Sequence, residues 1–355
     1  MTKCARCERL PESAPAAGRL FLVPPIAPTC AIIEDVLERL SLEYTTPFPQ
    51  VYEIPFGEGD LRRLCEEYGE TISALEQADT KCFILPRDEA LSVAHLATME
   101  PLRVLVARIR AGWLTDMLAQ KRLTSWFQPI ADKEGVIHGH ECLMRGIGLD
   151  GAIISPIEIY NVARQSDLLF FLDCACRINA VRCAAEHGVA SRLFINFVPA
   201  SIYRPEACLQ STFKAISDVG LQPENIVFEV VESETVRDTE HLLRVLSFYR
   251  DHGFKVALDD LGAGYSSLNL LSRLQPDYIK LDMALVRDVD VDPYKANITE
   301  NLLNMAQKLG VRSVAEGVET QGELHWLLEH GADLLQGFLL GHPAPEPASS
   351  VSMPA

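Results

Sequence analysis

The segment VALDDLGAGYSSL, from Val256 to Leu268, joins an apolar run to two adjacent carboxylates and then to a glycine-rich turn. The apolar run predicts a buried strand, and the serines near its end offer a cap for a following helix. Side chains alternate across a strand, so Asp259 and Asp260 share one cavity only where that strand is ending. Two like charges about 4 Å apart repel by roughly 1–4 kcal/mol, so such a pair requires cations nearby. An acidic turn that caps the next helix is the alternative.

Composition and charge restrict the classes of function. The 355 residues are 48% hydrophobic and 23% charged, with a formal net charge of −17. This charge argues against a nucleic-acid polymer as partner, because such a surface needs clustered lysine and arginine. No stretch reaches about 18 uninterrupted apolar residues, which predicts no membrane span. The first residues lack the apolar core of a signal peptide, and several cysteines lie in apolar helical runs, so we expect a cytoplasmic protein.

From residue 123 onward, apolar runs alternate with amphipathic stretches. Strands are expected at residues 125–130, 136–144, 193–197, 226–231, 255–259, 278–281, 313–316 and 333–337. About eight strands over roughly 235 residues fit a (β/α)8-type, TIM-like barrel of the α/β class. The turn from Asp132 to Gly135 is too short for a helical crossover, which predicts an antiparallel first strand.

The first third of the chain predicts a small α/β module. Strand-like runs at 20–23, 51–55 and 81–85 alternate with helical stretches at 31–42 and 60–68. This module carries no phosphate-binding loop, so sensing, docking or dimerisation is its expected role. An apolar stripe from Leu102 to Met117 has helical spacing, and either core packing or a helix that couples the two domains explains it.

Five segments are therefore expected along the chain. They are a flexible tail at 1–18, a regulatory or dimerisation module at 19–100, a linker helix at 101–120, the barrel at 121–345 and a disordered tail at 346–355. The first tail contains Cys4 and Cys7, which form half of a zinc knuckle. Two interpretations of this pair remain, a Zn²⁺ site or two solvated thiols without a metal.

Acidic and amide residues stand near the ends of almost all the predicted barrel strands. They are Glu141, Asn196, Glu229, Asp259, Asp260, Asp282, Glu316 and Gln336, with Lys280 among them. The carboxyl ends of parallel barrel strands share one face, where active sites form. Solvated charges belong on helices and loops instead. Oxygen ligands of this kind select Mg²⁺ or Mn²⁺ over zinc.

The stretch from Leu123 to Pro345 resembles the EAL-domain cyclic di-GMP phosphodiesterases. The motifs that carry the resemblance are ECLMR at 141–145, FQPI at 127–130, INFVP at 195–199, FEVVES at 228–233, DDLGAGYSS at 259–267, YIKLD at 278–282, AEGVET at 315–320 and QGF at 336–338. Three positions depart from the usual pattern: Cys142 stands for Ala, Val198 for a small polar residue and Leu261 for Phe. The resemblance does not extend to residues 1–120.

The resemblance implies a role for each matching residue. Metal ligands would be Glu141, Asn196, Glu229, Asp259, Asp260 and Glu316, around two ions of Mg²⁺ or Mn²⁺. Catalysis would use Glu141, Lys280, Glu316, Asp260 and Gln336. Glu232 would hold the loop from Asp260 to Gly264, and Gln128, Leu143 and Arg145 would contact the nucleotide.

The resemblance also implies an activity and an assembly. The expected reaction is hydrolysis of cyclic di-GMP to linear 5′-pGpG, which lowers a bacterial second messenger. Apart from the resemblance, we expect the N-terminal module to regulate this activity. A non-catalytic receptor for the same nucleotide is the alternative, although such receptors typically lose carboxylates that this chain keeps. A homodimer through the EAL barrel is expected as well.

Overall fold

The computed structural model describes residues 15–231, 239–262 and 267–353. These residues divide into two compact units, each described by itself. One unit contains residues up to Lys121 together with Ser155–Leu172, and the other contains Arg122–Ile154 and the chain from Asp173 onward. The expected boundary near residue 120 did not foresee that residues 155–172 join the first unit. No helix of the described residues has the length and apolar character needed to cross a membrane.

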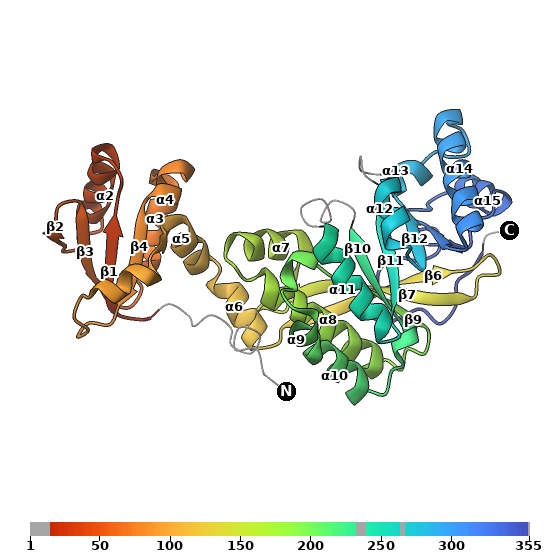
Figure 1. Cartoon of the computed structure of the whole chain (residues 1–355), viewed down its shortest axis with the longest axis horizontal. Coiled ribbons are helices and arrows are strands. Elements are labelled where there is room, and N and C mark those ends of the chain that lie inside the picture. The colour runs from red at the N-terminus through yellow and green to blue at the C-terminus, as the bar shows by residue number, and fades with distance from the viewer. Residues whose placement is uncertain (1–14, 232–238, 263–266, 354–355) are drawn as a thin grey trace. The chain divides into compact units, whose positions relative to one another are not determined.

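The first unit is built on a five-stranded sheet in the order β2-β3-β1-β4-β5. Its elements are β1 (Gly18–Val23), α2 (Ala27–Arg39), β2 (Thr45–Phe48), β3 (Val51–Phe56), α3 (Asp60–Thr71), α4 (Ala74–Asp79), β4 (Lys81–Leu85), η1 (Val93–Thr98), β5 (Glu100–Pro101), α5 (Leu102–Arg110), α6 (Gly112–Ala119) and α7 (Pro156–Gln165). Central strand β1 pairs antiparallel with β3 and with β4 (Figure 1). This β-α-β-β-α-β order is the ferredoxin-like arrangement.

The two faces of this sheet are covered differently. Leu20 and Leu22 of β1 pack into a core with helices α2, α3 and α5, whereas Phe21 points to the other face and stacks on Phe83. This follows from the alternation of side chains along a strand. Residues of α5 such as Leu105 belong to the same core, so packing accounts for the first half of the apolar stripe.

The stripe from Leu102 to Met117 lies on two helices, where one linker helix was expected. Helix α5 ends at Arg110 and α6 begins at Gly112, because Ala111 leaves the helical region at φ −85° and ψ 8°. Glycine at the start of α6 contributes to this break, since it is the poorest helix former after proline.

The second unit is a closed barrel of eight strands with one short additional strand, β8, at its edge. Its strands are β6 (Leu123–Ala131), β7 (Ile137–Ile147), β8 (Ile153–Ile154), β9 (Arg192–Asn196), β10 (Ile226–Val231), β11 (Lys255–Leu261), β12 (Tyr278–Leu281), β13 (Arg312–Ala315) and β14 (Leu334–Leu335). Strands β7 and β9–β14 run parallel, whereas β6 is antiparallel to both of its neighbours, β7 and β14. Strands β6 and β7 form the long pair drawn in yellow in Figure 1.

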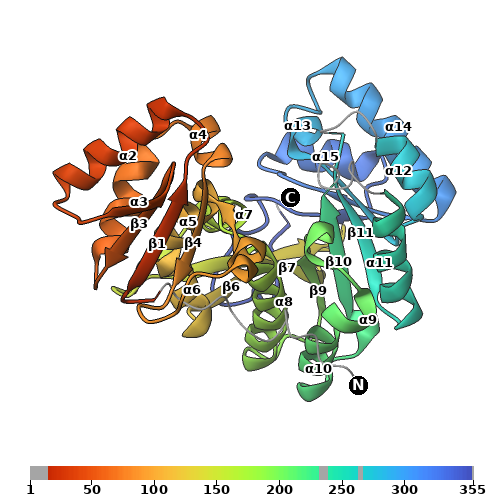
Figure 2. The same ribbon diagram turned by 60° about the vertical axis from the view of Figure 1, so that its left-hand side comes forward.

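Helices cover the outside of the barrel between its strands. They are α8 (Leu169–Glu186), η2 (Pro199–Ser201), α9 (Pro205–Cys208), α10 (Gln210–Asp218), η3 (Pro223–Asn225), α11 (Thr239–Asp251), α12 (Ser267–Leu274), α13 (Met283–Val286), α14 (Pro293–Leu309) and α15 (Gln321–Glu329). Figure 2 shows β9, β10 and β11 as neighbouring strands, and α11 packs against β11. Inside, one layer of apolar side chains fills the barrel: Ile130, Phe194, Val227, Ala257, Tyr278, Val314 and Leu334.

The C-terminal segment differs from the disordered tail that was expected at 346–355. The backbone of Ala344 exchanges two hydrogen bonds with Phe127 of β6. The imidazole of His140 lies 3.1 Å from the carbonyl oxygen of Ala348, and Val351 is buried. Backbone carbonyls and one valine are enough to hold a proline- and alanine-rich segment against a barrel, although its composition predicts disorder. Residues 354–355, like Cys4 and Cys7, lie outside the described residues.

Candidate active site

The polar residues predicted at the strand ends gather at one end of the barrel. Glu141 lies on β7, Asn196 ends β9, Glu229 lies on β10, Asp259 on β11 and Lys280 on β12. Glu316 directly follows β13, and Gln336 directly follows β14. The parallel strands carry these side chains to the same face, as expected for a barrel.

Asp259 and Asp260 come together because β11 contains a bulge. The strand continues to Leu261, but its pairing with β12 shifts between Leu258 and Leu261. Asp260 adopts the left-handed conformation, with φ of 57°, and its N–H donates to the Asp259 carboxylate at 3.1 Å. A bulge of this kind redirects a side chain and increases the local twist. Both carboxylates therefore reach the same side of a strand that does not end there.

Lys280 is the centre of the cluster. Its ammonium lies 2.6 Å from Glu316, 2.9 Å from Glu229, 3.1 Å from Asp259 and 3.5 Å from Glu141. The lysine side chain is 1% exposed. One cation thus faces four carboxylates in a place that water hardly reaches, and negative charge remains in excess.

Two amide side chains orient these carboxylates. The amide nitrogen of Asn196 donates to Glu141 at 3.1 Å and to Glu229 at 3.2 Å. The amide nitrogen of Gln336 donates to Glu141 at 2.6 Å and to the Gln128 oxygen at 3.1 Å. The oxygen of Gln336 is buried and has no hydrogen-bond partner among the described residues. A buried acceptor without a partner indicates that a donor or a cation completes this site.

Burial and mutual repulsion raise the pKa values of the carboxylates. Burial raises the pKa of Glu316 to about 8, although the ammonium of Lys280 acts in the opposite direction. The pKa of Asp260 rises to about 6, first through burial and then through Asp259 and Asp282. The pKa values of Asp259 and Glu229 rise for the same reason, burial. Burial alone would lower the pKa of Lys280, but the surrounding carboxylates raise it well above its usual value.

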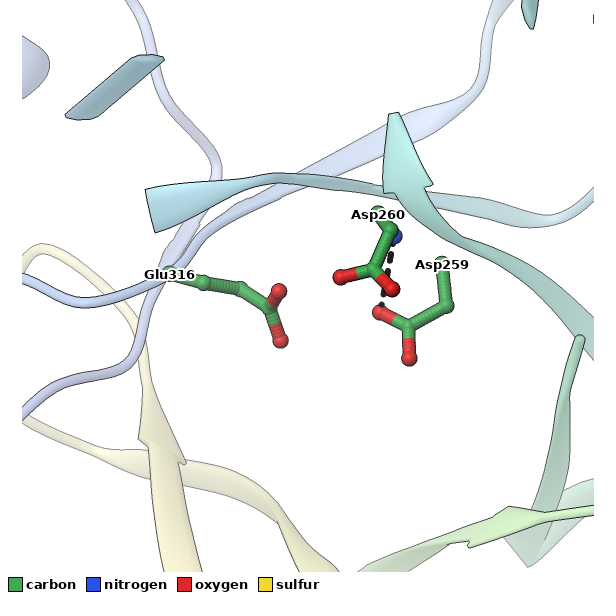
Figure 3. A group of neighbouring side chains, drawn as sticks. All are labelled: Asp259, Asp260 and Glu316. Atoms are coloured by element: carbon green, nitrogen blue, oxygen red, sulfur yellow. Dashed lines mark hydrogen bonds between the residues drawn. The ribbon is translucent and has the colours of Figure 1, made fainter. Parts of the chain in front are cut away.

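Three of these carboxylates have the geometry of a cation site. Asp259, Asp260 and Glu316 each offer an oxygen, and these atoms all lie within 4.8 Å of one another. Figure 3 shows Glu316 pointing toward the two aspartates at the end of β11. An all-oxygen donor set suits Mg²⁺ or Mn²⁺ better than zinc. The residues present therefore fit a hard divalent cation.

The residues expected to bind the nucleotide lie on β6 and β7 beside this cluster. Gln128 is buried and donates to the Gly341 carbonyl at 3.2 Å. The Arg145 guanidinium lies over the Trp126 ring at 4.9 Å, and both Arg145 and Leu143 are partly exposed. Glu232, the expected support of the loop up to Gly264, lies outside the described residues.

The three departures from the usual motifs occupy defined places. Cys142 and Leu261 are both buried, and burial raises the pKa of the Cys142 thiol well above its usual value, so packing explains it. Val198 lacks a polar side chain, yet its backbone N–H donates to the Asp173 carboxylate at 2.9 Å.

Asp173 is a positioning residue that sequence reasoning missed. It lies on α8, fully buried, and forms an ion pair with Arg177 one turn later. Ser201 also donates to Asp173, so one carboxylate anchors both ends of the segment that follows Asn196. A charged pair spaced i, i+4 in the mostly apolar first half of this helix was the available signal.

Comparison with known proteins shows the family of the chain. The EAL domain family matches residues 111–343. This chain belongs to the EAL domain family. Its matched region contains all of the strand-end residues described above, and we call the second unit the EAL barrel from here on.

One curated relative and two solved structures show how far the similarity extends. The Escherichia coli K12 protein named "Probable cyclic di-GMP phosphodiesterase PdeG" is 33% identical over 231 residues, which are 62% of this chain and 44% of that protein. The alignment thus spans less than half the length of that relative. The structure of a standalone versatile EAL protein from Vibrio cholerae O395, in its c-di-GMP-bound form, is 37% identical with a TM-score of 0.59. It covers 64% of this chain and 95% of its own.

A third similarity extends beyond the EAL barrel. The structure named Klebsiella pneumoniae BlrP1 manganese/cy-diGMP complex covers 92% of this chain and 96% of its own, with a TM-score of 0.57 and 24% identity. At this level of identity the likeness concerns the fold alone. It includes the N-terminal residues that the family match leaves out.

Proposed function

We propose that this protein hydrolyses cyclic di-GMP to linear 5′-pGpG with the help of divalent cations, and that the EAL barrel carries the reaction. The observation that supports this most strongly is the set Asp259, Asp260 and Glu316, whose oxygens converge beside the Lys280 ammonium. The names of the relatives supply the substrate. Water adds across one phosphodiester bond, which leaves a 5′ phosphate on one nucleotide and frees a 3′ hydroxyl on the other.

Two bound Mg²⁺ or Mn²⁺ ions would neutralise the phosphodiester and lower the pKa of coordinated water. The proposed ligands are Glu141, Asn196, Glu229, Asp259, Asp260 and Glu316. Asn196 directs its amide nitrogen at two carboxylates, so its oxygen is the atom left for a cation. The proposed ligand set thus combines five carboxylates with one amide oxygen.

The other residues act directly on water and substrate. Lys280 holds four carboxylates in place and supplies positive charge for the scissile phosphate. Without a bound cation, burial raises the pKa of Glu316 to about 8, so in that state it can take up a proton near neutral pH. The oxygen of Gln336, which has no partner in the described part of the chain, can accept a hydrogen bond from water. Gln128, Leu143 and Arg145 lie on adjacent strands, where they can contact the nucleotide.

The test is turnover by the purified full chain. The protein is incubated with cyclic di-GMP and either Mg²⁺ or Mn²⁺, and 5′-pGpG is followed by chromatography. We expect turnover that chelation stops and that Glu141→Ala lowers by more than about a hundredfold. The matched control is Glu240→Ala, an exposed glutamate on α11. Binding without turnover under both metals would favour a receptor instead.

The EAL barrel also offers a surface for the proposed homodimer. Helices α13 and α14 and the loop between them expose Met283, Val291, Tyr294 and Ile298. Leu285 of α13 meets the chain at Gly262, just after the two aspartates, so a partner on this surface would border the site. Exposed apolar residues mark protein contacts where they form one contiguous patch. Sedimentation that shows only monomer at micromolar concentration would contradict the dimer.

The N-terminal module is proposed to regulate this activity. Its sheet has its own core, which an aspartate in place of buried Leu64 would disrupt. We expect Leu64→Asp to change turnover while the EAL barrel stays folded by circular dichroism. Unchanged turnover would contradict regulation.

The proposed Zn²⁺ at Cys4 and Cys7 is tested separately, since zinc well below one per chain in metal analysis rules it out.

A further inference from the structure

A cavity lies at the amino-terminal end of the EAL barrel, opposite the carboxylates. Its volume is about 680 Å³, within the range of small-molecule sites. The first residues of four strands line it: Arg192 of β9, Lys255 of β11, Tyr278 of β12 and Arg312 of β13. Apolar walls come from the ends of α12 and α14 and the residues after them, among them Leu271, Pro276, Leu309 and Val311. We name this the basal cavity.

Its three cationic side chains differ in their partners. Lys255 forms an ion pair with Asp277 at 2.8 Å, so its charge is already balanced. The Nε of Arg192 is buried without a hydrogen-bond partner among the described residues. Arg312 lies 3.2 Å from Nδ1 of His138 through its Nη1. Neither arginine forms an ion pair with a carboxylate in the described part of the chain, which leaves two guanidinium groups uncompensated.

His138 also faces these two arginines. The pairing of β6 with β7 shifts between Ile130 and Ala131, so His138 is an unpaired residue of a bulge. Its ring contacts Phe194 and Tyr278 of the inner layer, and Nε2 lies 3.0 Å from the Tyr278 hydroxyl. Burial, and then Arg312 and Arg192, lower the pKa of His138 to about 4. Burial is the largest cause, the two arginines add to it, and the Asp132 carboxylate acts in the opposite direction, so both guanidinium charges are sensed at this histidine.

Of the two helix ends at this cavity, that of α12 does not cancel the charge of the arginines. The last carbonyls of a helix carry partial negative charge. At the end of α12, however, Arg250 donates to the carbonyls of Leu274 and Gln275. Those acceptors therefore already have a cation of their own, and Arg192 and Arg312 stay available to a ligand.

We propose that the basal cavity binds a small organic phosphate, with the phosphate held by Arg192 and Arg312 and the organic part against the apolar walls. Guanidinium groups match the oxygens of phosphate in a two-bond fork. Tyr278 lines the same cavity, and its hydroxyl is held by His138 Nε2 at 3.0 Å. The volume suits a ligand of nucleoside monophosphate size better than inorganic phosphate alone.

The test uses the full chain with EDTA and no divalent cation, so that phosphate cannot reach the carboxylate end through a metal. AMP, adenosine and inorganic phosphate are titrated separately by calorimetry. We expect one AMP site per chain, weaker binding of phosphate and none of adenosine. Equal binding of AMP and adenosine would overturn the proposal, and so would the absence of saturable AMP binding up to roughly 10 mM, where even a millimolar affinity would be visible.

Two variants assign the site. Arg192→Gln and Arg312→Gln should each weaken AMP binding about tenfold or more, because a charge-assisted hydrogen bond is lost. Arg273→Gln is the matched control, since that guanidinium is exposed on α12 and pairs with Glu240. Binding that survives both cavity substitutions, or that Glu316→Gln abolishes instead, would overturn the proposal. Should a glutamine variant unfold, Arg192→Lys and Arg312→Lys keep the charge but lose the fork, and unchanged AMP binding in both would equally overturn it.

Discussion

The ammonium of Lys280 lies 2.9 Å from the carboxylate of Glu229, and these two side chains are 1% and 0% exposed. A buried pair of this kind is stable only while both partners are present. Around it stand three more carboxylates, so Lys280 balances a larger negative charge than its own. The stability of the barrel end therefore depends on cations.

Replacing Lys280 with Met should destabilise the metal-free protein by about 3–5 kcal/mol, because the buried carboxylates lose their counter-ion. Added Mg²⁺ should then restore more stability in this variant than in the original chain. The free energy of unfolding in urea, with EDTA and with Mg²⁺, measures both effects. Lys214→Met is the control, an exposed lysine that pairs with Asp218 and should matter by less than about 1 kcal/mol. Equal stability of both variants in EDTA would contradict the prediction.

Asp260 should make the metal-free protein less stable as the pH rises. Its pKa is about 6 in the folded chain against an ordinary value of 3.8, so the folded state holds the proton more tightly. The resulting stabilisation is complete below about pH 4 and is lost as the pH rises through about 6. Asp260→Asn removes this dependence and still tolerates the left-handed backbone. It should be more stable than the original chain above pH 6 and similar to it near pH 4.

Urea unfolding across this pH range, with EDTA present, measures the difference. Asp251→Asn, at the exposed end of α11, serves as the control and should leave the profile unchanged. A constant offset between Asp260→Asn and the original chain at every pH would show that packing, rather than protonation, distinguishes them.

Leu261 should not accept the aromatic ring that is usual at its position in the family. The side chain is fully buried and pairs in register with Leu281. Leu261→Phe should therefore destabilise the protein by about 1–3 kcal/mol through overpacking. Leu149→Phe, on a side chain that is 85% exposed, is the control. A stabilised Leu261→Phe would show that the structure leaves room there.

Asp173→Asn should destabilise the protein and lower turnover together. The substitution removes the negative charge that Asp173 offers to buried Arg177, at a cost of about 3–5 kcal/mol. It also weakens the hold on Val198 and Ser201, which position the segment after Asn196. Urea unfolding gives the stability, and kcat measured well below the melting temperature gives the positioning effect. Normal kcat in the folded variant would mean that Asp173 is structural only.

Local patterns predicted the strands well where the strands are buried on both sides. The expected strands 226–231 and 278–281 have the bounds of β10 and β12. Short apolar runs between turn residues are too short for a buried helix, so they predict a buried strand. Gly112 could have predicted the break between α5 and α6, but the continuous apolar stripe led to the prediction of one helix.

Features that depend on the backbone or on distant partners could not be read in this way. The bulge at Asp260 is a property of the pairing between β11 and β12, and no spacing of residues reveals it. The anchor from Asp173 to Val198 joins positions 25 residues apart. Similarly, the strand-end carboxylates were identified, but their common attachment to Lys280 required the folded barrel.

Strand β12 is four residues long, Tyr278–Leu281, and each of its ends borders a different site. Tyr278 borders the basal cavity, while Lys280 holds the carboxylates only two residues, or roughly 7 Å, further along. The basal cavity and the carboxylate cluster are therefore close enough along β12 for a change at one to reach the other. A displacement of β12 by a fraction of an ångström at Tyr278 would therefore move Lys280 as well, because the two residues share one short strand.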